Sequence, residues 1–314
     1  MRPIFFILLV VMNLFWAGTY AVFKVLGQYL DAGAIVTVRY GLALLGLLAL
    51  WPWLPGRSPG RRDWPRLAVM GVVVFCVGPR LQVMAVHLGR AGDTSLLMAL
   101  EPLVTAVAAA FFLREYIAPR RWLGFGLGMA GVVLLSDVWR GASPLRGVLP
   151  NLLFVTSFFS ETAYSILGKP LLQRTGSWRL LTAGLVAGTL ANLGLEALPS
   201  STPLWTVLPT LPGRAWVMLF YLAIICTIVG YGLWYVVIRE TEVNLAAMTI
   251  FVQPVAGLTL SVLWVGESMH WGQLWGSLVI AAGLAVGLRF NGRKPLRSAP
   301  PAPVSSQPAG VRSR

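Results

Sequence analysis

Residues 91–135 read AGDTSLLMALEPLVTAVAAAFFLREYIAPRRWLGFGLGMAGVVLL, and residues 243–287 read VNLAAMTIFVQPVAGLTLSVLWVGESMHWGQLWGSLVIAAGLAVG. Aligned at a constant offset of 152 residues, the two stretches share five residues in the same order and at the same spacing. The shared residues pair as Pro102 with Pro254, Glu115 with Glu267, Gly124 with Gly276, Ala130 with Ala282 and Gly131 with Gly283. Because the match needs no gap, we interpret the two stretches as copies of one repeated unit.

The composition of the whole chain excludes a water-soluble protein. Of 314 residues, 57% are hydrophobic and 11% are charged, and the mean hydropathy is +0.74. A soluble domain carries about 25% charged residues, so this chain has too few to cover its apolar surface in water. Cys76 and Cys226 each stand alone in an apolar run, and no CxxC or HExxH motif occurs, which excludes a disulfide scaffold and a cysteine-rich metal site. We therefore expect a membrane protein with no metal and no cofactor.

The apolar windows predict an all-α membrane protein. A membrane-spanning helix needs about 20 mainly apolar residues, and ten windows qualify. They lie near 4–25, 34–53, 67–88, 94–113, 122–137, 148–168, 180–198, 215–238, 244–265 and 272–290. Ten windows divide into five for each repeat, and because five is odd, the second repeat must enter the bilayer from the opposite side. The expected fold is ten transmembrane helices in two inverted five-helix repeats, a construction typical of secondary transporters.

The same windows divide the chain into four parts. Residues 1–137 form the first repeat, 138–147 an extracytoplasmic loop, and 148–290 the second repeat. Residues 291–314 are rich in Pro, Ser and Arg without an apolar period, which predicts a disordered cytoplasmic tail.

The basic residues predict the orientation of the chain. The net charge is +14, but the Lys and Arg residues fall in short clusters between apolar windows and not in one patch, so we expect no nucleic-acid partner. Of the 25 basic residues, 18 fall on one side of the predicted membrane and four on the other, while Lys24, Arg39 and Arg80 lie inside spans. The positive-inside rule then places both termini in the cytoplasm. We expect the chain in the cytoplasmic membrane, which is the inner membrane of a bacterium.

The sequence resembles a known family of membrane proteins. The segment WAGTYAVFK at 16–24 and the two repeat copies are similar to the two EamA domains of the drug/metabolite transporter superfamily, over residues 4–290. The resemblance implies a ten-helix bundle with inverted halves, a central cavity, and export or exchange of small metabolites, often amino acids or related compounds. It does not identify the substrate. Arg80 in the third span departs from the apolar or mildly polar residue that is more typical there.

Ionisable residues inside the spans are the first candidates for function. Such a group costs about 2.5–3.5 kcal/mol on insertion scales and therefore faces the bundle interior or water. We expect Arg39 or Arg80 to meet a substrate carboxylate or phosphate. Glu101 and Glu161 are the candidates to meet an amine or to carry a proton. The alternative is that these charges only pair with one another between helices.

A polar stripe and two prolines mark the fourth and ninth spans. Thr94, Met98, Glu101 and Thr105 follow one another at steps of four, three and four residues, which places them on one helical face. We expect this face to line a cavity, with Thr249 and Gln253 as its counterpart on the ninth span. Pro102 and Pro254 each remove a backbone donor, which permits either a hinge or a static kink.

Aromatic residues extend the predicted binding site. Trp16, Tyr20 and Tyr164 lie deep in their spans and are expected to form a cavity wall. Trp234 and Tyr235 lie closer to a span end, where membrane-interface anchoring is the favoured interpretation. Glu115, just beyond the fourth span, is expected to act as a capping or loop-fixing residue at the turn into the next helix, in the cytoplasm.

These features together predict a secondary transporter and not an enzyme. No GxxxxGK[ST] motif occurs, so ATP is not a direct energy source, and the GxGxxG of Gly126, Gly128 and Gly131 lies inside an apolar helix, where it cannot be a dinucleotide fingerprint. The expected activity is movement of an amino acid-like, amphipathic or cationic metabolite by alternating access, as an exporter or exchanger. The alternative is an intramembrane lipid-modifying enzyme, which would need a cluster of acid–base or nucleophilic residues. The expected partners are a small-molecule substrate and the lipid bilayer, and a homodimer is left open.

Overall fold

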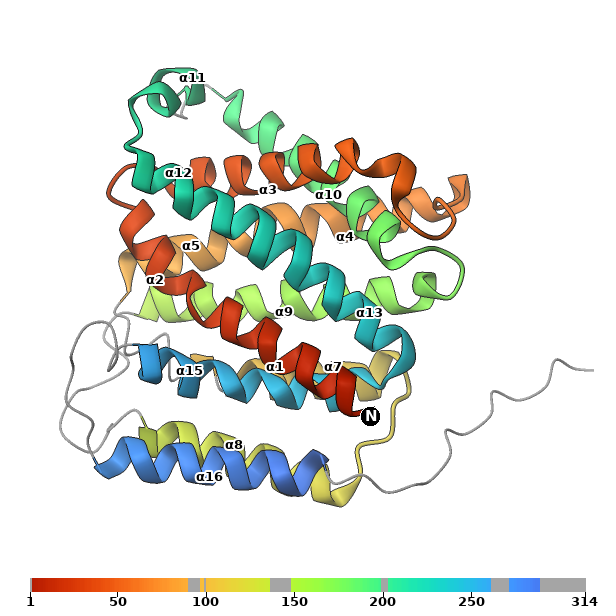
Figure 1. Ribbon diagram of the computed structural model, residues 1–314, viewed down its shortest axis with the longest axis vertical. Helices are drawn as coiled ribbons and strands as arrows, with labels where there is room; N and C mark the ends of the chain where they lie inside the picture. The colour runs from red at the N-terminus through yellow and green to blue at the C-terminus, as the bar shows by residue number, and fades with distance from the viewer. Residues whose placement is uncertain are drawn as a thin grey trace, which may run out of the picture.

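The computed structural model describes residues 2–89, 97–98, 100–135, 148–198, 203–260 and 271–288. All regular secondary structure in these ranges is helical. The long helices lie side by side with their axes running in roughly the same direction across the bundle (Figure 1). Of the sequence predictions, Thr94, Glu267, the loop 138–147 and the tail 291–314 lie outside the described residues.

The helices before residue 138 follow the predicted windows. They are α1 (Pro3–Ala17), α2 (Thr19–Leu26), α3 (Ala32–Ala49), α4 (Trp64–Val72), the π-helix η3 (Val73–Val77), α5 (Gly78–Leu88), α7 (Leu100–Phe112) and α8 (Pro119–Leu135), with the short 3₁₀ turns η1 (Trp51–Trp53) and η2 (Arg61–Asp63). Asp31 caps α3, because its carboxylate accepts a hydrogen bond of 2.8 Å from the backbone N–H of Ala34.

The helices of the second half have the same character. They are α9 (Val148–Leu172), α10 (Ser177–Glu196), α11 (Leu204–Val207), the 3₁₀ turn η5 (Leu208–Thr210), α12 (Gly213–Phe220), the π-helix η6 (Tyr221–Tyr231), α13 (Gly232–Glu240), α14 (Val243–Ala247), the 3₁₀ helix η7 (Met248–Phe251), α15 (Val252–Leu260) and α16 (Trp271–Leu288). A π-helical stretch thus interrupts the third long helix of each half, and such stretches are frequent at functional sites.

The prediction of an apolar, helical membrane protein is confirmed by these helices. Helix lies within each of the ten predicted windows. Within the described part of the chain, four continuous helical stretches are long and apolar enough to cross a membrane: Pro3–Leu26, Ala32–Ala49, Arg61–Leu88 and Gly213–Glu240. Leu100–Phe112, Val243–Gly257 and Leu274–Gly287 are apolar but shorter. The number of crossings therefore stays a prediction.

Helices α8 and α16 form a close antiparallel pair at one end of the bundle (Figure 1). A Cβ atom added to Gly124 would lie 2.9 Å from the carbonyl oxygen of Gly283, and one added to Gly131 would lie 2.7 Å from that of Gly276. Only glycine permits this approach of two backbones. The two contacts relate the two copies of the repeat. Gly124 contacts Gly283, which is the counterpart of Gly131, and Gly131 contacts Gly276, which is the counterpart of Gly124. This reciprocity is what a two-fold relation between the two helices produces.

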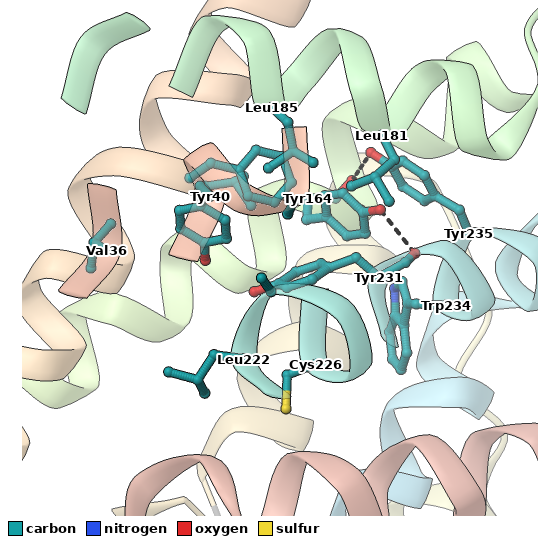
Figure 2. Packing of buried hydrophobic residues seen from close by; sticks show 14 of the residues in the cluster. Val36, Tyr40, Tyr164, Leu181, Leu185, Leu222, Cys226, Tyr231, Trp234 and Tyr235 are labelled. Carbon is teal, nitrogen blue, oxygen red and sulfur yellow. Dashed lines mark hydrogen bonds between the residues drawn. The ribbon is translucent and has the colours of Figure 1, made fainter. Parts of the chain in front are cut away.

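A cluster of aromatic rings fills the core beside α9, α10 and η6 (Figure 2). The rings of Tyr164 and Tyr235 stack with centroids 3.9 Å apart and planes inclined by 12°. Tyr164 donates a hydrogen bond of 2.9 Å to the carbonyl of Tyr231, and Tyr235 donates one of 3.2 Å to the carbonyl of Tyr164. Trp234 donates one of 2.8 Å to the hydroxyl of Ser165. The interpretation of Trp234 and Tyr235 as interface anchors is wrong, because their side chains are buried and their polar atoms have partners inside the bundle.

Candidate functional site

A cavity opens among helices from both halves of the chain. Its lining residues come from α1, α2, α3, α5, α7, α9, η6 and α15: Trp16, Thr19, Tyr20, Arg39, Gln82, Glu101, Glu161, Tyr231 and Gln253. Counted out to its mouth, the space not filled by protein atoms is about 390 Å³, and part of this space is open to solvent. The sequence predictions brought together here are Trp16, Tyr20, Arg39, Glu101, Glu161 and Gln253.

A second hollow continues from the first along α7, α9 and η6. It is lined by Trp16, Glu101, Thr105, Glu161, Tyr164, Ser165, Tyr231, Trp234 and Ile250, so the two hollows share Trp16, Glu101, Glu161 and Tyr231. The predicted aromatic wall of Trp16, Tyr20 and Tyr164 is therefore divided between the two hollows. The rings of Trp16 and Tyr231 contact each other with centroids 5.4 Å apart.

Arg39 supplies the positive charge of the cavity. Its side chain is only 3% exposed, and its Nε donates a hydrogen bond of 2.8 Å to the hydroxyl of Thr227 on η6. The guanidinium carbon lies 4.9 Å from the ring centroid of Tyr40 and 5.8 Å from that of Phe23, within the range of cation–π attraction. Among the described residues Arg39 forms no ion pair. The groups that touch the guanidinium are thus neutral, and the residue lines the cavity.

Glu101 and Glu161 supply the acidic groups of the same cavity. The hydroxyl of Tyr231 lies 3.0 Å from both carboxylate oxygens of Glu161, to which it donates. Glu101 is 8% exposed, and no hydrogen bond from the described residues reaches its carboxylate. A carboxylate in this position can accept hydrogen bonds from an ammonium group or take up a proton.

Arg80 lies outside the cavity, in a separate polar cluster between α3, α5 and α10. Its Nη2 lies 2.6 Å from the carboxylate of Glu196 and 3.2 Å from the hydroxyl of Thr37, and its Nε donates to the amide oxygen of Asn192 at 2.8 Å. The predicted substrate contact of Arg80 therefore finds no support in the structure, because its donors are directed to neighbouring helices. A cluster of this kind ties helices together.

The remaining predictions have mixed outcomes. Met98 lies on the predicted stripe, but it packs in the hydrophobic core and does not line either hollow. Pro102 lies in the first turn of α7, and Pro254 follows the 3₁₀ stretch of η7, so the backbone is irregular near Pro254. Whether either proline acts as a hinge stays a prediction.

Glu115 binds the start of α14, and not the turn into the next helix of the chain, where its sequence position predicted it to act. One carboxylate oxygen accepts from the backbone N–H of Val243 at 2.9 Å and from Lys169 at 2.7 Å, and the other accepts from the backbone N–H of Asn244 at 3.0 Å. These bonds satisfy donors at a helix N-terminus and tie α7, α9 and α14 together. Glu115 is therefore a capping residue, as one of the interpretations held, but it caps a helix of the other half of the chain.

Sequence reasoning missed three residues of the cavity, Thr19, Gln82 and Tyr231. It considered charges inside spans, but a buried amide also loses water and needs a partner. Gln82 stands inside an apolar window and donates to the hydroxyl of Tyr20 at 3.4 Å. A search for Asn and Gln inside spans would have found it, together with Asn13, which contacts Gln253 from α1.

Comparison with known proteins also indicates a transporter. A family model described as the EamA-like transporter family matches residues 3–137 and again 148–289. The chain is 24% identical over 286 residues to a transporter of Archaeoglobus fulgidus, covering 88% of this chain and 95% of the relative. It is 25% identical over 288 residues to a "Probable terminal-alkyne amino-acid exporter" of Streptantibioticus cattleyicolor, covering 91% and 94%. It is also 24% identical to the inner membrane transporter YedA of Escherichia coli, covering 81% and 80%. A crystal structure at 18% identity shares the fold with a TM-score of 0.72, covering 91% of this chain and 98% of the other.

Proposed function

This chain belongs to the EamA-like transporter family, and we propose that it moves a small zwitterionic metabolite, such as an amino acid, across the cytoplasmic membrane by alternating access. The observation that carries this proposal is the cavity in which Arg39 faces Glu101 and Glu161 from other helices. A solute with a carboxylate and an ammonium group is complementary to such a mixed-charge wall. Two relatives whose names refer to amino-acid export or efflux agree with this substrate class.

Each charged residue has one role in the proposal. Arg39 holds the solute carboxylate, since its planar donors match that group in geometry and charge. Glu101 and Glu161 accept hydrogen bonds from the ammonium group. Trp16 and Tyr231 form the wall against which the apolar part of the solute packs. Loading the site thus neutralises charges that are costly to keep inside a membrane.

The proposed architecture of the protein has ten spans in two inverted five-helix halves, with both termini in the cytoplasm. The reciprocal glycine contacts between α8 and α16 support a two-fold relation between the halves. The π-helical stretches η3 and η6, at matching places in the two halves, support it as well. Two equivalent halves can exchange conformations and so expose one midplane site to either side in turn.

The proposal includes coupling to protons through Glu101. The Glu101 carboxylate forms no hydrogen bond with a described residue, so it can carry a proton when the ammonium group is absent. Exchange of the two would couple outward flux of solute to inward movement of protons, so flux should respond to a pH gradient.

The test is flux in liposomes that contain the purified protein. We expect native protein to transport a radiolabelled neutral amino acid faster when a pH gradient is imposed, and Glu101→Gln to lose that response. Glu240→Gln, at an exposed position outside the cavity, is the matched control and should behave as native. Absence of flux for every amino acid by native protein would overturn the transporter proposal. An unchanged gradient response in Glu101→Gln would overturn the proton role alone.

A further inference from the structure

Behind the cavity wall, a chain of hydrogen bonds runs from α1 to Gln253. Its central member is Asn13, whose side chain is 0% exposed. The Nδ2 atom of Asn13 donates to the carbonyl oxygen of Leu9 at 2.8 Å and to the hydroxyl of Thr249 at 3.1 Å. The Thr249 hydroxyl donates its own hydrogen bond to the carbonyl oxygen of Ala246 at 2.7 Å, so it accepts the hydrogen bond from Asn13.

These contacts determine which way the amide of Asn13 points. A backbone carbonyl can only accept, so the NH₂ group of Asn13 must face Leu9, and its oxygen must face the other way. That oxygen accepts from Nε2 of Gln253 at 2.8 Å. The direction of every bond in the chain therefore follows from the Leu9 carbonyl, and the amide of Gln253 has one orientation.

The consequence concerns the cavity. Gln253 lines it, with its NH₂ group turned to Asn13, and no hydrogen bond from the described residues occupies its amide oxygen. Gln253 also occupies the position that matches Glu101 at the repeat offset of 152, and both residues line the same cavity. Each half of the chain thus contributes one acceptor at equivalent positions, each directly before a proline.

We propose that Asn13 is a positioning residue that turns the amide oxygen of Gln253 toward the cavity, where this oxygen and the Glu101 carboxylate together receive the ammonium group of the solute. The inference rests on the proposed function and adds the place where the ammonium group binds. An ammonium group has three donors and no acceptor, so it needs several acceptors and is repelled by an NH₂ group. Without Asn13, Gln253 could present either end of its amide.

A purely structural role for Asn13 would predict something different. In that case its removal would loosen α1 against η7 and weaken all ligands alike. A positioning role weakens only ligands that carry an ammonium group. The two roles are separated by the ratio of affinities for a compound with the group and a compound without it.

The experiment measures equilibrium binding of L-phenylalanine and of 3-phenylpropanoate, its analogue without the amino group, to the purified protein in lipid nanodiscs. For native protein we expect L-phenylalanine to bind at least about tenfold more tightly, the size of one hydrogen bond to a charged group. Asn13→Leu should reduce this ratio about tenfold and leave the affinity for 3-phenylpropanoate unchanged. Gln253→Leu should have the same effect, and combining the two substitutions should add nothing further.

Asn192→Leu is the matched control. Asn192 is also fully buried in a helix and also donates to the carbonyl four residues earlier, that of Gly188, at 2.9 Å, but it does not line the cavity. Its substitution should lower the melting temperature and leave the ratio unchanged. If Asn13→Leu does not fold, Gln253→Leu alone tests the inference. An unchanged affinity ratio in Gln253→Leu would show that the amide oxygen of Gln253 does not bind the ammonium group.

Several results would overturn the inference: a native ratio near one, an unchanged ratio in Asn13→Leu, or effects of Asn13→Leu and Gln253→Leu that add. Its failure is distinguishable from failure of the proposed function. Flux with an unchanged ratio would overturn the role of Asn13 only. Loss of the ratio in Asn13→Leu without flux of any amino acid by native protein would support the ammonium site and overturn transport.

Discussion

Arg39 on α3 and Arg80 on α5 lie on neighbouring helices, and both side chains sit within the apolar bundle. Arg80 is bonded to a carboxylate, an amide and a hydroxyl, all from adjacent helices. Arg39 is bonded to one hydroxyl and lies over two aromatic rings, and it faces a cavity that also holds Glu101 and Glu161. A buried charge needs compensation, and Arg80 receives it from a carboxylate 2.6 Å away, whereas Arg39 forms no ion pair among the described residues. We propose that the first arginine serves stability and the second serves binding.

The largest effect is expected from breaking the cluster of Arg80. Arg80→Leu leaves Glu196 without its guanidinium, and removing one partner of a buried pair costs about 3–5 kcal/mol. We expect a loss of this size in the free energy of unfolding, measured by chemical unfolding in detergent micelles. The double substitution Arg80→Leu/Glu196→Leu should regain part of it, because the Glu196 carboxylate is then no longer buried without the guanidinium of Arg80. Equal stability of Arg80→Leu and native protein would contradict the structural role.

A smaller effect, of another kind, is expected at Arg39. Arg39→Leu removes the donors for the solute carboxylate, and hydrogen bonds to charged groups contribute about 1.5–3 kcal/mol. Amino-acid flux in liposomes should fall at least about tenfold, while the free energy of unfolding falls by less than in Arg80→Leu, because Arg39 forms no ion pair with a carboxylate of the described residues. Unfolding as severe as that of Arg80→Leu would show that the two arginines do not differ.

The smallest effect is expected at the hydroxyl that contacts Glu161. Tyr231→Phe removes the donor to both carboxylate oxygens at 3.0 Å but leaves the Glu161 carboxylate in place for the ammonium group, so we expect KM for the amino acid to rise only about fivefold. Tyr235→Phe is the matched control, because its hydroxyl donates to the carbonyl of Tyr164 and does not reach the cavity. Equal changes in KM for both variants would mean that Tyr231 acts through packing alone.

The helices and several cavity residues could be predicted from sequence because the bilayer restricts what a chain can do. Backbone groups in lipid must bond within their own helix, so apolar windows identify helices. The cost of a charge in lipid identified Arg39, Glu101 and Glu161 as residues facing the interior. The sequence could not separate Arg39 from Arg80, because the partner of Arg80 lies 116 residues away and meets it only after α5 and α10 have packed.

Two other differences have equally specific causes. Trp234 was assigned to the membrane interface from its place near a span end, but its N–H finds the Ser165 hydroxyl inside the bundle. Asn13 and Gln82 were passed over because they carry no charge. A buried amide is nevertheless as informative as a charge, since it must be bonded or face a ligand.

The central claim, that Arg39 receives the carboxylate of the solute while the acidic residues receive its ammonium group, is tested most directly by a change of preference. Flux of L-phenylalanine and of phenethylamine, which lacks the carboxylate, is measured in the same liposomes for native protein and for Arg39→Leu. The account predicts that native protein prefers L-phenylalanine and that Arg39→Leu prefers phenethylamine, because the variant keeps Glu101 and Glu161. Equal losses of both fluxes in Arg39→Leu, with the native preference retained, would contradict it.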